Sequence, residues 1–252
     1  MKILTLARDL QRRKARERQS LFVAEGIRSV EELLRSTLSI RGALATRQLA
    51  ESSRGRVLMG QMQSRGILTE EVGFEEFASA AETESPQGIL AIGVVPQTAL
   101  ADLPPTASMR LLVLDAIQDP GNVGTILRTA AALGATATFS LPGTVDLWNA
   151  KVVRSGMGAH FHHLCFSGDW EGVEAFRRDR GVAVWAADAS GEPLEGSSPP
   201  AKLALIVGNE GSGLSSLPRS RADRIVALSI GGAVDSLNVA VAAGILLYEL
   251  RP

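Results

Sequence analysis

Three short polar segments carry the side chains in this sequence that could do chemistry: residues 119–124, 208–214 and 236–244. The last segment couples a polar pair, Ser236 and Asn238, to an uninterrupted run of small apolar residues. Ser236 could simply cap a helix, whereas a buried asparagine without a partner would cost about 1–3 kcal/mol. The combination is typical of a buried helix whose first turn directs polar groups at a ligand.

The first polar segment ends a predicted strand and opens a predicted helix. Asn122 lies near the helix N-terminus, where it could serve as a cap or position a substrate, and the sequence favours neither. Arg128 lies in the second turn, off the apolar stripe, where a cation gains nothing from the positive end of the helix dipole. That placement suits a bound phosphate or another anion, so we favour a functional role for Arg128.

The second polar segment places three glycines within six residues directly after an apolar strand. Glycines there let the backbone approach a ligand closely or adopt positive φ. The order G-x-x-G-x-G matches neither a P-loop nor the G-x-G-x-x-G fingerprint of dinucleotide-binding folds, which disfavours a nucleotide-dependent oxidoreductase. A tight turn would explain the glycines, but it would not explain Glu210 among them.

Alternating strands and helices predict how these segments are positioned. After residue 110, strands are predicted at 111–114, 136–139, 182–186, 203–207 and 225–228, with helices at 123–131, 147–156, 169–178 and 237–250. This alternation predicts an α/β fold with a mostly parallel sheet covered on both faces. Ligands bind outside the carboxyl ends of such strands, and each polar segment follows a predicted strand.

A smaller α/β module is predicted before this region. Strands at 21–24 and 88–95 flank a helix at 27–34, and the proline-containing segment 96–109 follows as a linker. The first 20 residues hold seven cations against two anions, although the whole chain has a net charge of only -1. Such a cluster indicates a polyanion partner, and a solvated helix face explains it equally well.

Composition excludes several other classes. Cys165 is the only cysteine, so a disulfide within the chain and a cysteine-based metal site are excluded. The histidines His160, His162 and His163 lack acidic partners at ligand spacing, which favours packing over metal binding. The longest apolar run is far shorter than the roughly 20 residues of a membrane span, and arginines interrupt any signal-peptide pattern. We therefore expect a cytoplasmic protein without metal or membrane.

The polar segments, taken in order, resemble the three motifs of the SpoU/TrmH family of RNA 2′-O-methyltransferases in the SPOUT superfamily. The resemblance includes the stretch 151–159, and the N-terminal module with 22–26 resembles the substrate-binding domain of the family's ribosomal-RNA members. One departure is visible: the family usually carries Ile-Pro-Met before its glycine turn, whereas this sequence has Leu228, Ser229 and Ile230. Backbone contacts to the cofactor can survive that change.

The resemblance implies a C-terminal SPOUT domain at 110–252 with a deep trefoil knot, after an L30e-like RNA-binding domain at 1–95 and the linker at 96–109. It also implies an S-adenosylmethionine cofactor and a homodimer. The implied catalytic residues are Asn122, Arg128, Glu210, Ser236 and Asn238. The implied cofactor-binding residues are Gly208, Asn209, Glu210, Gly213, Ile230, Leu237 and Asn238. The expected RNA-binding residues are Arg12, Arg13, Lys14, Arg16, Arg18 and Arg154.

The implied reaction is methyl transfer to a ribose 2′-hydroxyl. A full N-terminal module of about 95 residues favours ribosomal RNA over transfer RNA by analogy. Transfer RNA stays an alternative, as does an RNA-binding member without catalysis. The second alternative predicts damaged motifs, and none of the five implied catalytic residues is replaced. The family often gives the arginine the role of base, but a guanidinium stays protonated in proteins, so we expect Arg128 to bind phosphate and stabilise developing charge.

Overall fold

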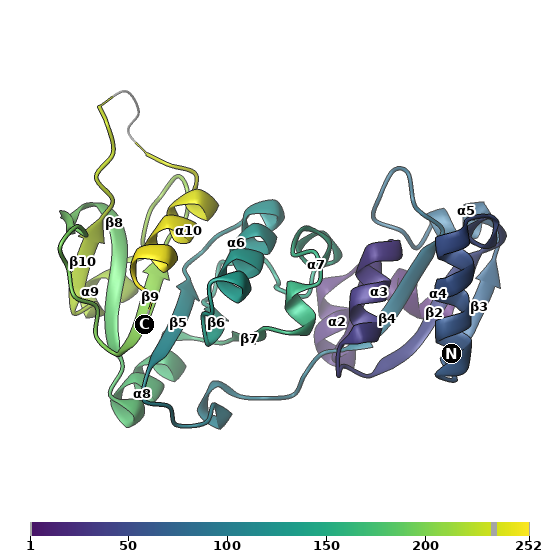
Figure 1. Cartoon of the computed structure of the whole chain (residues 1–252), viewed down its shortest axis with the longest axis horizontal. Coiled ribbons are helices and arrows are strands. Elements are labelled where there is room, and N and C mark those ends of the chain that lie inside the picture. The colour runs from purple at the N-terminus through teal and green to yellow at the C-terminus, as the bar shows by residue number, and fades with distance from the viewer. Residues whose placement is uncertain (1, 233–235, 252) are drawn as a thin grey trace. The chain divides into compact units, whose positions relative to one another are not determined.

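The computed structural model describes residues 2–232 and 236–251, and the chain forms two compact units (Figure 1). Unit 1 comprises the chain up to Gln97 together with the segment Trp148–His162. Unit 2 comprises Thr98–Leu147 and the chain from His163 onward. The segment predicted as a helix at 147–156 within the catalytic region thus belongs largely to the N-terminal unit.

Unit 1 is built on a four-stranded sheet in the order β1-β4-β2-β3. The β1–β4 and β4–β2 pairs are antiparallel, and β2–β3 is parallel. Its strands are β1 (Leu21–Glu25), β2 (Ile40–Thr46), β3 (Thr69–Val72) and β4 (Ile89–Val94). Its helices are α1 (Ile3–Asp9), α2 (Arg13–Gln19), α3 (Ile27–Arg35), α4 (Ser53–Ser64), α5 (Phe74–Ala78) and α7 (Ala150–Ser155), with the 3-10 turns η1 (Arg47–Glu51) and η3 (Ala159–Phe161).

Aromatic packing holds the segment Trp148–His162 in unit 1. The ring of Phe22 on β1 is fully buried, and its centroid lies 4.6 Å from that of Trp148 and 5.7 Å from that of Phe161. The turn after α7 also packs closely on α3, because a Cβ at Gly158 would lie 2.7 Å from Glu32 Cβ. The segment 148–162 is therefore part of the unit 1 core.

Unit 2 contains a six-stranded sheet in the order β10-β8-β9-β5-β6-β7, and all of its pairs are parallel. The predicted α/β fold with a parallel sheet is confirmed. Its strands are β5 (Met109–Leu114), β6 (Ala137–Ser140), β7 (Leu164–Ser167), β8 (Ala183–Pro193), β9 (Lys202–Val207) and β10 (Arg224–Ala227). Its helices are α6 (Pro120–Ala132), α8 (Trp170–Arg180), α9 (Ser216–Arg221) and α10 (Val239–Glu249), with the 3-10 turn η2 (Leu100–Asp102). The trefoil knot stays a prediction.

His163, just before β7, gives unit 2 a pH-dependent element of stability. Its side chain is buried, with Nε2 2.8 Å from Thr138 Oγ1, and burial lowers the pKa of His163 to about 4. An unfolded histidine titrates near pH 6.5, so the unfolded state binds more protons between pH 6.5 and 4. Stability must therefore fall as the pH falls through this window.

We expect this residue to contribute on the order of 1–3 kcal/mol of pH-dependent stability. A His163→Gln variant should lose less unfolding free energy than the wild type between pH 7 and pH 4.5, because glutamine does not titrate. Urea denaturation of both proteins at the two pH values measures the difference. Equal losses in the two proteins would contradict a neutral, buried His163.

Candidate active site

A cavity of about 310 Å³ lies in unit 2 beside the middle of β8 and the carboxyl ends of β9 and β10. Its walls come from residues 187–189 within β8, 207–213 at and after the end of β9, and 226–230 at and after the end of β10. Residues before and within α10 complete them. Parallel strands place their carboxyl ends at one edge, where ligands bind in open α/β sheets. The cavity is therefore at the position that the sequence pattern predicts.

The loop after β9 is shaped by glycine and by Asn209. A Cβ at Gly208 would lie 2.6 Å from the carbonyl carbon and oxygen of Gly213, so only glycine allows the loop to close. Asn209 and Gly213 exchange two backbone hydrogen bonds of 3.0 Å each. Asn209 Oδ1 accepts from the N–H groups of Gly211 and Ser212 at 2.9 and 3.0 Å, and its Nδ2 donates to Ala116 O at 2.9 Å. Asn209 therefore organises the loop that lines the cavity.

Asp115 anchors the far end of the same loop, a role that the sequence does not suggest. This buried carboxylate, one residue beyond β5, accepts from Ser215 N at 2.6 Å and from Ser215 Oγ at 2.8 Å. Hydrogen bonds to an ionised acceptor are stronger than neutral ones. The glycine loop is thus held at both ends by side chains.

A chain of side-chain hydrogen bonds joins the three polar segments. Asn122 Nδ2 donates to Glu210 Oε1 at 2.5 Å, and Asn122 Oδ1 accepts from Asn238 Nδ2 at 3.0 Å. Asn122 lies on α6, Glu210 lies in the loop after β9, and Asn238 immediately precedes α10. The structure therefore brings three of the five predicted catalytic residues into one network.

The N-caps of α6 and α10 are not the residues that the sequence suggests, and the Asn122 side chain is therefore not used as a cap. Asp119 is the N-cap of α6 and accepts from Asn122 N at 2.7 Å, so the Asn122 side chain is left to bridge its neighbours. Asn238 rather than Ser236 caps α10, where its Oδ1 accepts from Ala240 N at 2.9 Å and from Val241 N at 3.3 Å. Asn238 is exposed, so the cost of burying it without a partner does not arise.

Six of the seven predicted cofactor-binding residues line the cavity: Gly208, Asn209, Glu210, Gly213, Ile230 and Leu237. The seventh, Asn238, is not among the lining residues. Ser236, predicted as catalytic, does line the cavity. Arg128 is exposed on α6 and forms no ion pair within the part of the chain that the structure describes.

Sequence reasoning missed the segment 187–189 on β8, which lines the cavity. Two alanines there carry no motif, and they lie within β8, which continues to Pro193, so no position after a strand marks them. Between them, Asp188 accepts from Ser190 Oγ at 2.7 Å and pairs with Arg219. The Ser190 hydroxyl and the Arg219 guanidinium lower the pKa of Asp188, so its carboxylate is ionised at neutral pH and its charge is paired with that of Arg219.

The N-terminal cations differ in their availability. Arg12 and Arg18 pair with Asp9 at 3.5 and 3.2 Å, and Arg13 pairs with Glu17 at 2.7 Å, all on the surface. Arg16 is buried, and its guanidinium donates to Leu10 O at 2.8 Å and to Gln11 O at 2.9 Å. Expecting Arg16 to bind RNA therefore conflicts with its structural role, because it satisfies carbonyls at the end of α1.

Comparison with known proteins decides the family. The SpoU rRNA Methylase family model matches residues 109–248, and the MRM3-like substrate binding domain model matches residues 3–91. The chain belongs to the SpoU rRNA methylase family. It is 34% identical over 243 residues, covering 96% of this chain and 93% of the relative, to the Bacillus subtilis 23S rRNA (guanosine(2553)-2′-O)-methyltransferase RlmP.

Solved structures agree with the SpoU assignment. An AdoMet-bound rRNA methyltransferase from Sinorhizobium meliloti is similar with a TM-score of 0.85 and 28% identity, covering 99% of this chain and 94% of that one. The SpoU methyltransferase AviRb from Streptomyces viridochromogenes, in complex with AdoMet, is similar with a TM-score of 0.85 and 26% identity. The match covers 98% of this chain and 96% of that one. Both similarities extend over nearly the whole chain, so they include both units of the SpoU family member described here.

The described part of the chain holds neither a metal-binding cluster nor a membrane-spanning helix. Within 2–232 and 236–251, three or more His, Cys, Asp or Glu side chains nowhere gather as they would around a metal ion. Over the same residues, every helix is too short or too polar to cross a bilayer.

Proposed function

We propose that this protein transfers a methyl group from S-adenosylmethionine to a ribose 2′-hydroxyl of ribosomal RNA. The observation that carries the proposal is the hydrogen-bonded chain Glu210–Asn122–Asn238, which joins three polar segments beside one cavity. Relatives named as rRNA methyltransferases, one of them a 2′-O-methyltransferase, support the substrate class. An rRNA substrate is consistent with a cytoplasmic location.

The cavity has the composition that a nucleoside cofactor requires. Its volume of about 310 Å³ is at the lower end of the range of small-molecule sites, which are mostly apolar with a few oriented polar groups. Leu237, Val239 and Leu246 supply apolar walls, and the closed glycine loop supplies backbone groups. The cofactor would supply a methyl group already activated on a sulfonium.

The protein's own task is then to hold and orient the acceptor hydroxyl. Asn122 can do so because each end of its amide has hydrogen-bonding capacity left: one N–H beyond the bond to Glu210 and one lone pair beyond the bond from Asn238. Ser236 lines the cavity and can contact the same hydroxyl. Arg128 would bind an RNA phosphate and stabilise the charge that develops on the oxygen.

A division of labour follows as part of the proposal, with RNA recognition in 1–95, a linker at 96–109 and catalysis in 110–252. Arg12, Arg13, Lys14 and Arg18 would contact phosphates, together with Arg154. Deleting 1–95 is a poor test, because the segment 148–162 would lose the core in which Trp148 and Phe161 pack. Charge-reversal variants of the exposed arginines test the same idea in a folded protein.

A homodimer is proposed from one face of α10. Val241, Ile245 and Tyr248 are 52%, 40% and 52% exposed and follow at helical spacing, which places them on one stripe. Ile245 also lines a second cavity of about 290 Å³ beside the helix. The adjoining side of α10 packs on α6, where Thr129 Cγ2 would lie 3.3 Å from a Cβ at Gly244. A second copy of this chain would cover the exposed stripe.

We expect a Val241→Glu variant to shift the protein from dimer to monomer at micromolar concentration, because a carboxylate would be buried in an apolar interface. Sedimentation velocity measures the shift. Val57→Glu is the matched control, since Val57 is 61% exposed on α4 in unit 1. A wild-type protein that sediments as a monomer would contradict the dimer.

The function is tested by mapping 2′-O-methyl marks in ribosomal and transfer RNA from cells with and without the gene. Loss of one ribosomal mark, restored in vitro by purified protein and S-adenosylmethionine, is the expected result. Loss of a transfer-RNA mark instead would establish the alternative substrate. If all marks persist and the protein still binds RNA, it is a non-catalytic member of the family.

A further inference from the structure

A further cavity of about 310 Å³ lies within unit 1, whereas the proposed methyl-transfer site belongs to unit 2. Its lining includes the N-terminal turn of α3 and the preceding strand end, residues 83–87, and two residues of the segment 148–162, Arg154 and Met157. Its size is comparable to that of small-molecule sites. All of these residues belong to one compact unit.

The first turn of α3 presents hydrogen-bond donors to this cavity. The N-cap is Gly26, which has no side chain to accept from the helix, and Gln87 Oε1 takes only the Ile27 N–H, at 2.9 Å. Among the described residues, the N–H groups of Arg28 and Ser29 meet no protein acceptor. Free N–H groups at a helix N-terminus, together with the helix dipole, favour an anion.

Ser29 adds an independent indication of a ligand. The residue is only 7% exposed, and it lines the cavity. Its hydroxyl has no hydrogen-bond partner within the described part of the chain. Buried hydroxyls normally have partners, because an unsatisfied one carries a desolvation penalty. An acceptor entering from the cavity would satisfy it.

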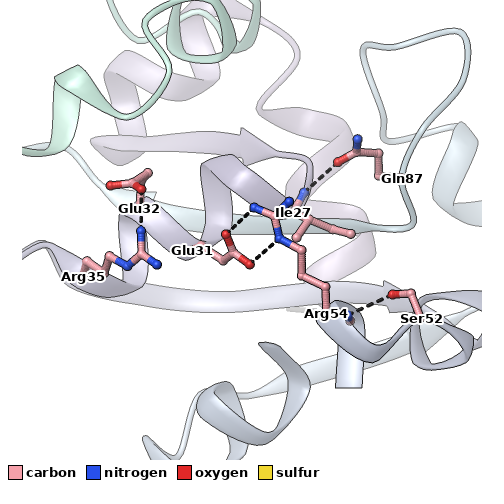
Figure 2. A network of polar contacts seen from close by, with 8 residues as sticks. Ile27, Glu31, Glu32, Arg35, Ser52, Arg54 and Gln87 are labelled. Carbon is pink, nitrogen blue, oxygen red and sulfur yellow. Dashed lines mark hydrogen bonds and ion pairs between the residues drawn. The ribbon is translucent and has the colours of Figure 1, made fainter. Parts of the chain in front are cut away.

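Two unpaired cations also line the cavity. Arg28 on α3 and Arg154 on α7 are exposed, and neither forms an ion pair within residues 2–232 and 236–251. Figure 2 shows that the other charges of α3 are paired: Glu31 accepts two hydrogen bonds from Arg54, and Glu32 accepts one from Arg35 at 2.6 Å. Arg28 thus differs from the other arginine of its own helix.

Glu25 carries the one carboxylate among the residues that line this cavity, and it already accepts hydrogen bonds from the protein. Glu25 is buried at the end of β1, where it accepts from Glu82 N at 2.8 Å and from Thr83 Oγ1. These bonds hold the loop that contributes Thr83, Ser85 and Gln87 to the cavity. Glu25 therefore fixes a wall, and the ligand-facing charges are the two arginines.

We propose that this cavity receives one unpaired nucleotide of the RNA, with its phosphate between Arg28 and Arg154 at the N-terminus of α3. Ser29 donates its hydroxyl to the same nucleotide. The volume exceeds what a phosphate alone would fill, which favours a nucleotide splayed out from a loop or bulge, the form in which RNA sequence is usually read. This inference rests on the proposed function, because it specifies where unit 1 binds the substrate RNA.

The test measures RNA affinity of the full-length protein by filter binding, with ribosomal RNA and with a single-stranded oligouridine as probes. Arg28→Gln and Arg154→Gln should each weaken binding by roughly 5- to 30-fold and reduce the salt slope by about 0.7, the value for one single-strand phosphate contact. Arg35→Gln is the matched control, because it removes the same charge from the same helix at an ion pair, and it should change affinity less than about twofold.

Ser29→Ala separates binding from folding. It should leave the melting temperature unchanged or higher, because an unsatisfied buried hydroxyl is removed, and yet lower RNA affinity. S-adenosylmethionine affinity should be unchanged in every variant. If Arg28→Gln and Ser29→Ala bind like Arg35→Gln while the wild type methylates RNA, the nucleotide site is refuted and the proposed function stands. A wild type without any RNA affinity would refute both.

Discussion

Replacing Arg128 with alanine is expected to lower the rate of methyl transfer by about 10²- to 10³-fold, the usual cost of removing one group that stabilises transition-state charge. The affinity for S-adenosylmethionine should change little, because Arg128 does not line the cavity. The fold should also be retained, since the side chain is exposed on α6 and forms no ion pair with any described residue. Single-turnover methylation of mapped substrate RNA measures the rate.

Arg178→Ala is the control for this substitution. Arg178 is also an exposed arginine on a helix of unit 2, with its side chain 72% exposed, and among the described residues it pairs only with Glu174 on the same helix. Its removal should leave the rate within about twofold of the wild type, the range expected for a surface ion pair. Comparable rates for the Arg128 and Arg178 variants would exclude a catalytic role for Arg128.

An Arg128→Lys variant distinguishes charge stabilisation from proton abstraction. Lysine keeps the positive charge but titrates near pH 10.4, whereas arginine stays protonated. If Arg128 stabilises charge, the variant should retain part of the rate and follow the wild-type pH profile. A rate that rises with a new ionisation near the lysine pKa would instead favour a base at this position.

Replacing Gly208 with alanine is expected to weaken S-adenosylmethionine binding by at least about 100-fold, equivalent to roughly 2.7 kcal/mol. The added Cβ would lie 2.6 Å from the backbone of Gly213 and 2.8 Å from Leu214 N. Backbone cannot move aside as a flexible side chain does, so the two hydrogen bonds that close the loop would be broken. The cavity would then lose the wall formed by 208–213.

Gly172→Ala on α8 provides a matched control, because Gly172 does not line the cavity. A Cβ there would lie 3.6 Å from Asp169 Oδ1, an ordinary van der Waals contact. Isothermal titration calorimetry of both variants should therefore show near-normal affinity for Gly172→Ala and a large loss for Gly208→Ala. Normal binding by Gly208→Ala would mean that the closed loop is not needed to hold the cofactor.

Much of unit 2 could be predicted because its signals are local. Strand β5 is buried at all six positions, so a continuous apolar run identifies it, and α6 shows the apolar spacing of a helix. The cofactor-binding residues are predicted from the family resemblance of the motifs, and the close backbone approach at Gly208 gives a physical reason for one glycine of the second motif. In contrast, β3 has the sequence TEEV and is only partly buried, so neither an apolar run nor alternation marks it.

Other features depend on contacts between distant residues and leave no local pattern. Asp115 resembles any carboxylate after a strand, and its role appears only when Ser215, 100 residues later, meets it. In the sequence Arg16 is one cation of a basic run, although in the structure it is buried and donates to the carbonyls of Leu10 and Gln11. Its neighbours Arg12 and Arg13 stay exposed, and composition alone does not distinguish them.

The contribution of residues 148–162 to unit 1 has a consequence for proteolysis. A single cut in the exposed stretch 104–108 would separate most of unit 1 from the rest of the polypeptide. The C-terminal fragment would nevertheless still contain the segment whose Trp148 and Phe161 rings pack on Phe22. The two fragments should therefore remain together as a noncovalent complex and elute as one species until a denaturant is added.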